Sequence, residues 1–287
     1  MIAKKVNREI NKDTFTENSV ERNKLLPKEA FLKKHKISPK AFLATKIKWS
    51  DLLKIHDDYV ASLGLLQNLA TEISSAFLTD DAKEVGVHSV RSRIKKPEGL
   101  IEKIIRKTIR DKKKGKAKSI TLKNYTSQIT DLVGVRVLHV FKDDWYQIHN
   151  FILNTCKFCP IEDPIAYYRK GDQKSFIDEC RRNGCEAKIH PKAYRSIHYV
   201  INRYPQKKLP LCEIQVRTVF EDGWSEIDHK LRYGTKTTEK HVLDSYLLAL
   251  NRIAGSADEI GTIIRNRVTE LGQSEYQKQL VKKKRKG

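Results

Sequence analysis

An acid, an amide and a cation alternate along the stretch Leu211–Arg217. Successive side chains of a strand point to opposite faces, so Glu213, Gln215 and Arg217 share one face while the intervening apolar residues face the core. Polar residues on a strand that simply faces solvent give the same pattern. Taken alone, this stretch therefore leaves a solvent-facing strand and a functional sheet face both open.

A second stretch favours the functional face. Within Tyr194–Asn202, the residues Tyr194, Ser196 and His198 again share one side of a predicted strand. Two neighbouring strands that both offer polar sets are more typical of an open working face than of two solvated edges. We therefore expect a polar substrate to bind across these strands.

Basic side chains upstream are spaced to hold phosphate groups. Arg91, Arg93 and Lys95 alternate along an extended segment, and a proline then starts a helix on which Lys103 and Lys107 stand one turn apart. Cations near a helix N-terminus suit a polyphosphate through charge and free amide groups. The sequence has no GxxxxGK[ST] loop, which excludes a P-loop enzyme. A solvated basic helix remains the alternative interpretation.

Two acids are candidates for a metal site. Asp131 lies at the start of a β-branched run, Asp131–Phe141, that predicts a buried central strand. Together with Glu213 it could supply two oxygen ligands for Mg²⁺, which takes its other ligands from water and phosphate. Asp131 as a loop or cap residue is the alternative.

Helices and a few strands must position these side chains. The pattern predicts an α+β fold with a small mixed sheet at its centre, flanked by helices. Residues 156–186 show no clear periodicity and are expected to be irregular. Strands are expected at 131–141, 194–202 and 211–217, and helices at 28–36, 50–77, 98–113, 143–155, from 218 onwards and at 242–271.

The composition limits the classes of protein. The chain has 287 residues, 39% of them hydrophobic, so it can bury a real core. Its apolar runs are far shorter than the ~18–20 residues of a membrane span, and its start lacks a secretory h-region. Five cysteines do not suggest a disulfide framework, so we expect a reducing, cytoplasmic setting; spacings that Zn²⁺ could accept are explained better by reduced thiols.

The formal charge of +22 is concentrated in three blocks, residues 1–48, 91–118 and 276–287. Such a field attracts polyanions, which include nucleotides and RNA, whereas terminal charge runs are often only solvated tails. We expect three segments: a basic extension at 1–48, a catalytic domain at 49–235, and a C-terminal helix with a basic tail at 236–287. No membrane partner is expected, and a homo-oligomer stays open.

Four motifs together resemble one family. They are RIKKPEGLIEKIIRK (93–107), TDLVGVRVL (130–138), YRSIHYVI (194–201) and EIQVRT…EDGWSEIDHKLRY (213–233). In this order, across residues 50–235, they are similar to the synthetase domain of RelA/SpoT alarmone synthetases, especially its stand-alone small forms. The resemblance implies a nucleotidyltransferase-like mixed sheet flanked by helices. It also implies Mg²⁺-dependent transfer of pyrophosphate from ATP to the ribose 3′-hydroxyl of GDP or GTP, as in a (p)ppGpp synthetase (GTP pyrophosphokinase).

The resemblance assigns roles to the matching positions. It implies that Asp131 and Glu213 bind Mg²⁺ and form the catalytic pair, with Glu213 also able to accept the 3′-hydroxyl proton. On the ATP side it implies that two arginines sandwich the adenine and two lysines hold the phosphates: Arg93, Arg136, Lys95 and Lys103. On the acceptor side it implies that a tyrosine stacks on the base beside three polar residues: Tyr194, His198, Gln215 and Arg217.

Two positions depart from the family pattern. Gly99 stands where the family usually has serine, and Ala193 stands where it usually has glycine before the stacking tyrosine. These departures concern the phosphate side and the acceptor pocket. Two other functions also stay open. One is a toxin that pyrophosphorylates the 3′ end of tRNA, drawn in by the basic segments. The other is a non-catalytic RNA-binding protein on a synthetase scaffold, which the intact set of acids and cations argues against.

Overall fold

The computed structural model describes residues 24–115, 119–154, 158–203, 210–234 and 240–284. Contacts divide the chain into two compact units: unit 1 is Met1–Leu65 with Lys95–Ile129, and unit 2 is Leu66–Ile94 with Thr130–Gly287. These boundaries differ from the division at residues 48 and 235 expected above. Four residues are predicted to bind the metal ion and the adenine, and all of them belong to unit 2: Asp131, Glu213, Arg93 and Arg136.

Unit 1 is helical. It contains α2 (Lys28–Lys34), α3 (Pro39–Thr45), α4 (Trp49–Ala61), α7 (Pro97–Lys113) and α8 (Tyr125–Gln128). Phe31 and Phe42 are buried and each meets the Trp49 ring edge-on, at centroid distances of 5.4 and 6.2 Å. Residues 28–45 of the basic extension are thus part of a core, although the sequence predicted only the first of their two helices.

The expected single helix over 50–77 is wrong, because it is broken at Ser62. Helix α4 ends at Ala61, and α5 runs from Leu63 to Ser75. The Ser62 hydroxyl donates a hydrogen bond to the carbonyl of Tyr59 at 2.8 Å, a local alternative that competes with the helical ladder. Both helices keep the predicted apolar face.

Unit 2 is built on a mixed sheet, as predicted. Within the described residues it has seven strands in the order β1-β2-β7-β6-β4-β5, and the short β3 pairs with β6. The pairs β2–β7 and β4–β5 are parallel and the other pairs are antiparallel. The strands are β1 (Val87–Ile94), β2 (Val133–His139), β3 (Cys159–Pro160), β4 (Ile165–Tyr168), β5 (Glu186–Ile189), β6 (Ser196–Asn202) and β7 (Cys212–Thr218).

The expectation of an irregular segment over 156–186 is also wrong. This stretch holds β3, β4 and helix α10 (Lys174–Arg182), and β5 begins at its end. Strands of two to four residues are too short to show a period, and each is defined by pairing with a distant strand instead. Residue Cys156 lies outside the described residues, and in the rest of the described chain no group of three or more His, Cys, Asp or Glu side chains is arranged to hold a metal ion.

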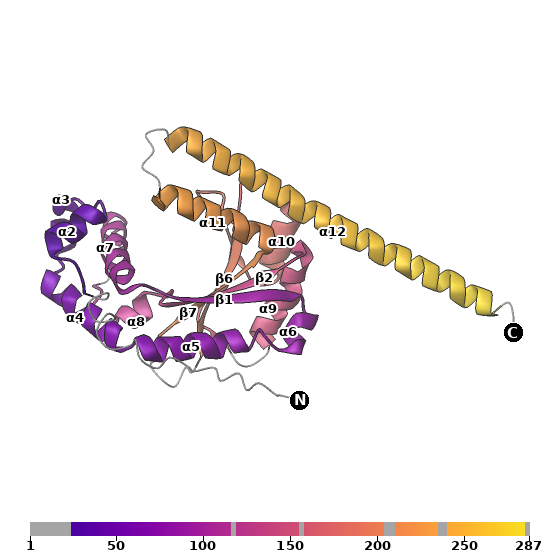
Figure 1. The fold of residues 1–287 in the computed structure, drawn as a ribbon, viewed down its shortest axis with the longest axis horizontal. Coiled ribbons are helices and arrows are strands. Elements are labelled where there is room, and N and C mark those ends of the chain that lie inside the picture. Colours follow the sequence, from indigo (N-terminus) through magenta and orange to yellow (C-terminus); the bar gives the residue numbers. More distant parts are fainter. Residues whose placement is uncertain (1–23, 116–118, 155–157, 204–209, 235–239, 285–287) are drawn as a thin grey trace, which may run out of the picture. The chain divides into compact units, whose positions relative to one another are not determined.

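Helices cover the two faces of this sheet (Figure 1). Helices α11 (Val219–Gly234) and α12 (Lys240–Lys284) run side by side, while α9 (Trp145–Asn154) lies across the sheet from them. The remaining short elements of unit 2 are α6 (Asp80–Glu84) and the 3₁₀ turn Lys142–Asp144. None of the described helices is both long enough and apolar enough to cross a membrane.

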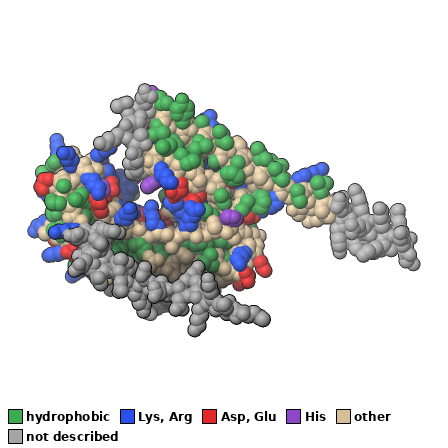
Figure 2. All heavy atoms as spheres, viewed as in Figure 1, with side chains coloured by type: hydrophobic (Ala, Val, Ile, Leu, Met, Phe, Trp, Pro, Cys, Tyr) green, Lys and Arg blue, Asp and Glu red, His purple; other side chains and the backbone are tan. Residues whose placement is uncertain are grey.

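Helix α12 is fixed to the sheet by buried polar contacts. Asp258 accepts a hydrogen bond from the Thr218 hydroxyl at 2.9 Å, and Asn251 donates to the carbonyl of Ala193 at 3.1 Å. Between them, Gly255 lets the Arg195 guanidinium approach so closely that an added Cβ would lie 2.5 Å from it. Away from these contacts, hydrophobic side chains cover much of the visible surface of α11 and α12 (Figure 2).

Candidate active site

The strand register produces one polar sheet face. Val133, Val135 and Val137 of β2 are all buried, and their partners across the parallel pair are likewise apolar. The alternate residues point to the other face, where Gly134 pairs with Glu213 and Arg136 pairs with Gln215. The expected division of strand 211–217 into a core face and a polar face is therefore present.

A cavity of about 390 Å³ opens over this face within unit 2. Four residues expected to bind ATP or metal line it together: Arg93, Asp131, Arg136 and Glu213. They come from β1, the turn before β2, β2 itself and β7, so a single cavity gathers residues separated by 120 positions. Gln215 lines the same cavity.

Acids on helix α11 hold Arg136. Its Nη1 donates to the Glu226 carboxylate and lies 3.4 Å from Oδ1 of Asp222. Burial opposes the charge of Arg136, but these two carboxylates outweigh it and raise the pKa of the guanidinium. The planar group is thus held in place at the edge of the cavity, as a stacking role requires.

The predicted acceptor residues form one hydrogen-bonded chain. The Arg217 guanidinium donates to the Tyr194 hydroxyl and to Oε1 of Gln215, and the Gln215 amide donates to Oε1 of Glu213. His198 Nε2 lies 3.3 Å from the Tyr194 hydroxyl, and its Nδ1 lies 3.6 Å from the Glu213 carboxylate. The side chains grouped by face in the sequence are therefore connected in space.

Two of these side chains are more enclosed than the sequence suggested. The Arg217 side chain is only 1% exposed, and its guanidinium carbon lies 4.9 Å from the centre of the Tyr194 ring. Burial raises the pKa of the Tyr194 hydroxyl. Arg217 thus acts on its neighbours, Tyr194 and Gln215, rather than through an exposed surface of its own.

The turn before Tyr194 has an unusual backbone. Ala193 adopts a φ of 58°, in the left-handed region that favours glycine. The residue at which this chain departs from the family pattern is therefore one whose backbone geometry suits the family's usual glycine. Asn251 of α12 binds the Ala193 carbonyl and helps to hold the turn.

The donor set beside the cavity fits Mg²⁺. Asp131 and Glu213 offer carboxylate oxygens to the same space, and Mg²⁺ is commonly held by one or two carboxylates together with substrate phosphates. The amide of Gln215 and the ring of His198 both approach Glu213 and orient its carboxylate. Such outer partners are typical of metal-binding acids.

The remaining two predicted residues belong to unit 1. Lys95 directly follows β1 in the sequence, and Lys103 lies on α7. Lys107, its neighbour one turn on, pairs with Asp111 at 3.1 Å. The role of Lys95 and Lys103 in holding phosphates stays a prediction.

Sequence reasoning missed three residues of α11 that line the cavity or bind a residue that does. Asp222 and Glu226 bind Arg136, and His229 lines the cavity beside them. Their spacing of four and then three residues places them on one side of α11, facing away from the buried Trp224. That spacing was present in the motif EDGWSEIDHKLRY, and it was the signal that could have identified them.

Sequence comparison finds curated relatives of this chain. Two curated relatives from Bacillus subtilis (strain 168) are each 27% identical to the chain: GTP pyrophosphokinase YwaC over 177 residues, covering 60% of this chain and 71% of the relative, and GTP pyrophosphokinase YjbM over 162 residues, covering 55% and 67%.

Solved structures show the same fold. Small alarmone synthetase 1 from Bacillus subtilis superposes with a TM-score of 0.54 at 20% identity, covering 75% of this chain and 99% of that one. A GTP pyrophosphokinase family protein from Streptococcus pneumoniae gives 0.50 at 22% identity, covering 78% and 95%.

A family model described as the region found in RelA / SpoT proteins matches residues 92–238. This match begins within β1 and takes in β2, β7 and α11, all of which contribute residues to the cavity. It spans more than half of the chain, so the chain belongs to the family of proteins that contain the RelA / SpoT region.

Proposed function

We propose that this chain transfers a pyrophosphate group from ATP to the ribose 3′-hydroxyl of GDP or GTP, forming (p)ppGpp. One observation carries the proposal: two arginines and two acids of the expected types converge on a single cavity of about 390 Å³. The curated relatives are named GTP pyrophosphokinases, which supports the same reaction for this chain.

The reaction needs positioning more than covalent chemistry. The acceptor 3′-oxygen forms a bond to the β-phosphorus of ATP, the bond from that phosphorus to the α–β bridging oxygen breaks, and AMP leaves. Glu213 accepts the proton of the 3′-hydroxyl in this proposal. Its orientation by Gln215 and His198 suits a group that must face one hydroxyl.

Mg²⁺ would be held by Asp131 and Glu213 together with ATP phosphates, and when bound it supplies neutralisation of phosphate charge. Arg93 and Arg136 contact the adenine, and Glu226 and Asp222 hold the planar guanidinium of Arg136 in position. Lys95 and Lys103 bind the phosphates.

On the acceptor side, Tyr194 stacks on the guanine base, with His198 and Gln215 beside it. Buried Arg217 positions Tyr194 and Gln215 through its hydrogen bonds. The enclosed position of the Tyr194 ring supports a preformed acceptor wall, since little ordering of this residue remains to be done on binding.

The test is a transfer assay with labelled ATP and Mg²⁺. The full chain is incubated in turn with GDP, GTP and deacylated tRNA, and the acceptor that becomes labelled is identified. We expect labelled guanosine product. Label only at the tRNA 3′ end would move the assignment to the tRNA-modifying alternative, and no transfer to any acceptor would refute the proposed enzyme.

The decisive variant is Glu213→Gln, which keeps the size of the side chain and removes its charge. We expect a loss of about 10²–10⁴-fold in transfer rate, the range for loss of a general base. Glu84→Gln on α6 removes one exposed acid of the same type and should leave the rate unchanged. More than a tenth of wild-type activity in Glu213→Gln would contradict the assigned role.

The basic segments give a second comparison between acceptors. Because α2 buries Phe31 and Leu32, a truncation should remove residues 1–23 only and leave the core of unit 1 intact. Kinetics with GDP or GTP should not change. Transfer to tRNA, if present in the full chain, should weaken and lose part of its salt dependence.

A further inference from the structure

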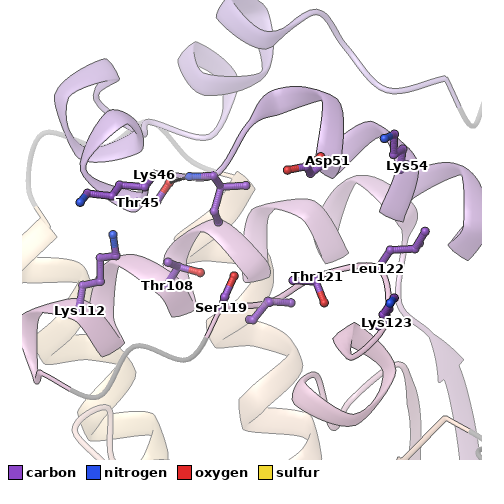
Figure 3. Close-up of a pocket in the computed structure, with 12 residues that line it drawn as sticks. Thr45, Lys46, Asp51, Lys54, Thr108, Lys112, Ser119, Thr121, Leu122 and Lys123 are labelled. Atoms are coloured by element: carbon purple, nitrogen blue, oxygen red, sulfur yellow. Dashed lines mark hydrogen bonds between the residues drawn. The ribbon is translucent and has the colours of Figure 1, made fainter.

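Unit 1 contains a cavity that is larger than the one beside Glu213. It has a volume of about 640 Å³, within the range of sites that enclose small organic ligands. Its walls come from the end of α3, the first turns of α4, the second half of α7 and the segment 119–123 (Figure 3). All of these belong to unit 1, and none of its lining residues lines the cavity beside Glu213.

The charge of this cavity is strongly positive. Four lysines line it, Lys46, Lys54, Lys112 and Lys123, against the single acid Asp51. Lys112 donates a hydrogen bond to the carbonyl of Ala44 at 2.9 Å, which holds its ammonium group at the rim. Within the described ranges, no ion pair is recorded for the other three, so their charge is not neutralised by a neighbouring carboxylate.

Lys46 occupies a position where a lysine side chain is costly. It caps the C-terminus of α3 with a φ of 61°, a left-handed conformation normally given to glycine or asparagine. A residue with a Cβ is strained in this conformation. The backbone conformation at this position therefore does not favour the lysine side chain that lines the cavity.

Hydroxyl groups and an apolar floor complete the lining. In Figure 3, the hydroxyls of Thr108 on α7 and Ser119 on the following segment point toward the same space, and Asp51 projects over it from α4. Thr108 is buried and its hydroxyl donates to the carbonyl of Ile104 at 2.9 Å. The lone pairs of the hydroxyl oxygen can still accept a hydrogen bond. Ile47 and the buried Ile120 supply apolar surface.

We propose that this cavity is a second ligand site, which binds a small phosphorylated molecule with an apolar ring, of nucleotide size. The lysines neutralise the phosphate groups, and Ile47 and Ile120 contact the ring. The Ser119 hydroxyl donates to a phosphate or sugar oxygen, and the Thr108 oxygen accepts from a sugar hydroxyl. The lone acid accepts a hydrogen bond from a ring or amino N–H. The lining, the volume and the charge all match this one class of ligand.

The site lies outside the proposed catalytic cavity, so it can be tested without measuring catalysis. Lysine acetylation by a limiting reagent, followed by peptide mass spectrometry, reports the accessibility of each lysine separately. The probes are ADP, inorganic tripolyphosphate and adenosine, each added to the full chain. At an ADP concentration about ten times its Kd, acetylation of Lys46 and Lys112 should slow about tenfold.

The matched variants are Lys54→Glu with Lys123→Glu, and Lys33→Glu with Lys40→Glu. Both pairs change the net charge equally, all four lysines are exposed residues of unit 1, and only the first pair lines the cavity. Protection of Lys46 and Lys112 by ADP should disappear in the first double variant and persist in the second.

Several results would overturn the proposal. If millimolar ADP does not protect Lys46 and Lys112, the proposed site is wrong. Equal protection of Lys33 would show a general attraction of anions to a basic protein. Tripolyphosphate as effective as ADP would rule out a contribution from the apolar floor. Persistence of protection in the Lys54→Glu, Lys123→Glu variant would place the ligand elsewhere.

Discussion

We expect one buried carboxyl group to make unit 2 less stable as the pH rises. Asp258 on α12 is 2% exposed and accepts one hydrogen bond, from Thr218. Burial, followed by the charge of Glu221, raises its pKa to about 8 from a usual value of 3.8, although Arg195 and Lys142 act in the opposite sense. The folded protein thus keeps the proton that the unfolded chain releases.

The sign of the effect follows from proton binding. Between about pH 4 and pH 8, the folded state binds one proton more than the unfolded state, so the free energy of unfolding falls as pH rises. A displacement of about four units corresponds to about 5 kcal/mol at 1.36 kcal/mol per unit.

Asp258→Asn removes this cost while keeping an oxygen that can accept from Thr218. We expect the variant to be more stable than the wild type at pH 8, by roughly 2–4 kcal/mol, the remainder being offset by desolvation of the buried Asn amide. The advantage should shrink toward pH 5. Urea unfolding, followed by tryptophan fluorescence, measures both values. Trp224 reports on α12, because its indole donates to the Leu247 carbonyl.

Asp244→Asn is the control, because it removes a more exposed acid from the same helix. Parallel loss of stability with pH in wild type and Asp258→Asn would refute the reasoning, as would a variant that is less stable than wild type at pH 8.

Other substitutions test the packing and the acceptor site. Gly255→Ala should destabilise unit 2 by about 1–3 kcal/mol, because the new Cβ meets the anchored Arg195; Gly261→Ala, in open space on the same helix, should instead stabilise by about 0.5–1 kcal/mol in urea unfolding. Ala193→Gly should relieve a left-handed alanine and change the unfolding free energy by less than about 1 kcal/mol, the relief being offset by chain entropy; a clear loss of stability would show that the turn is not strained. Tyr194→Ala should raise the acceptor KM by about 5–150-fold, from the ~1–3 kcal/mol of one stacked base, without changing the KM for ATP. Tyr194→Phe should keep most of that affinity, and equal losses in both variants would assign the effect to the hydroxyl.

The chemically important part of the fold could be predicted because its signals are local. Strands β2 and β7 are β-branched runs of alternating polarity, and the alternation correctly placed Glu213 and Gln215 on one face. Helices α7 and α11 have clear amphipathic periods and recognisable starts, such as the Thr218 hydroxyl that accepts from the Glu221 backbone amide at 3.1 Å.

What could not be predicted depends on distant partners. Strands β3, β4 and β5 are each two to four residues long and exist because β6 or one another lies beside them. The clasp of Asp222 and Glu226 on Arg136 joins residues about 90 positions apart. The burial of Arg217 needed the same long-range information, since its alternation alone placed it on an open face.

The central position of β7, between β2 and β6, also determines when the sheet can be completed during synthesis of the chain. Val133 of β2 pairs with Cys212, which the ribosome adds 79 residues later. At about 5–20 residues per second, β2 waits about 4–16 s for its parallel neighbour, and β6 waits for the same strand. Chains released before residue 212 carry two unpaired sheet edges, which favour aggregation, and they lack Glu213 altogether. We therefore expect chains that stop before residue 212 to lack transfer activity and to aggregate.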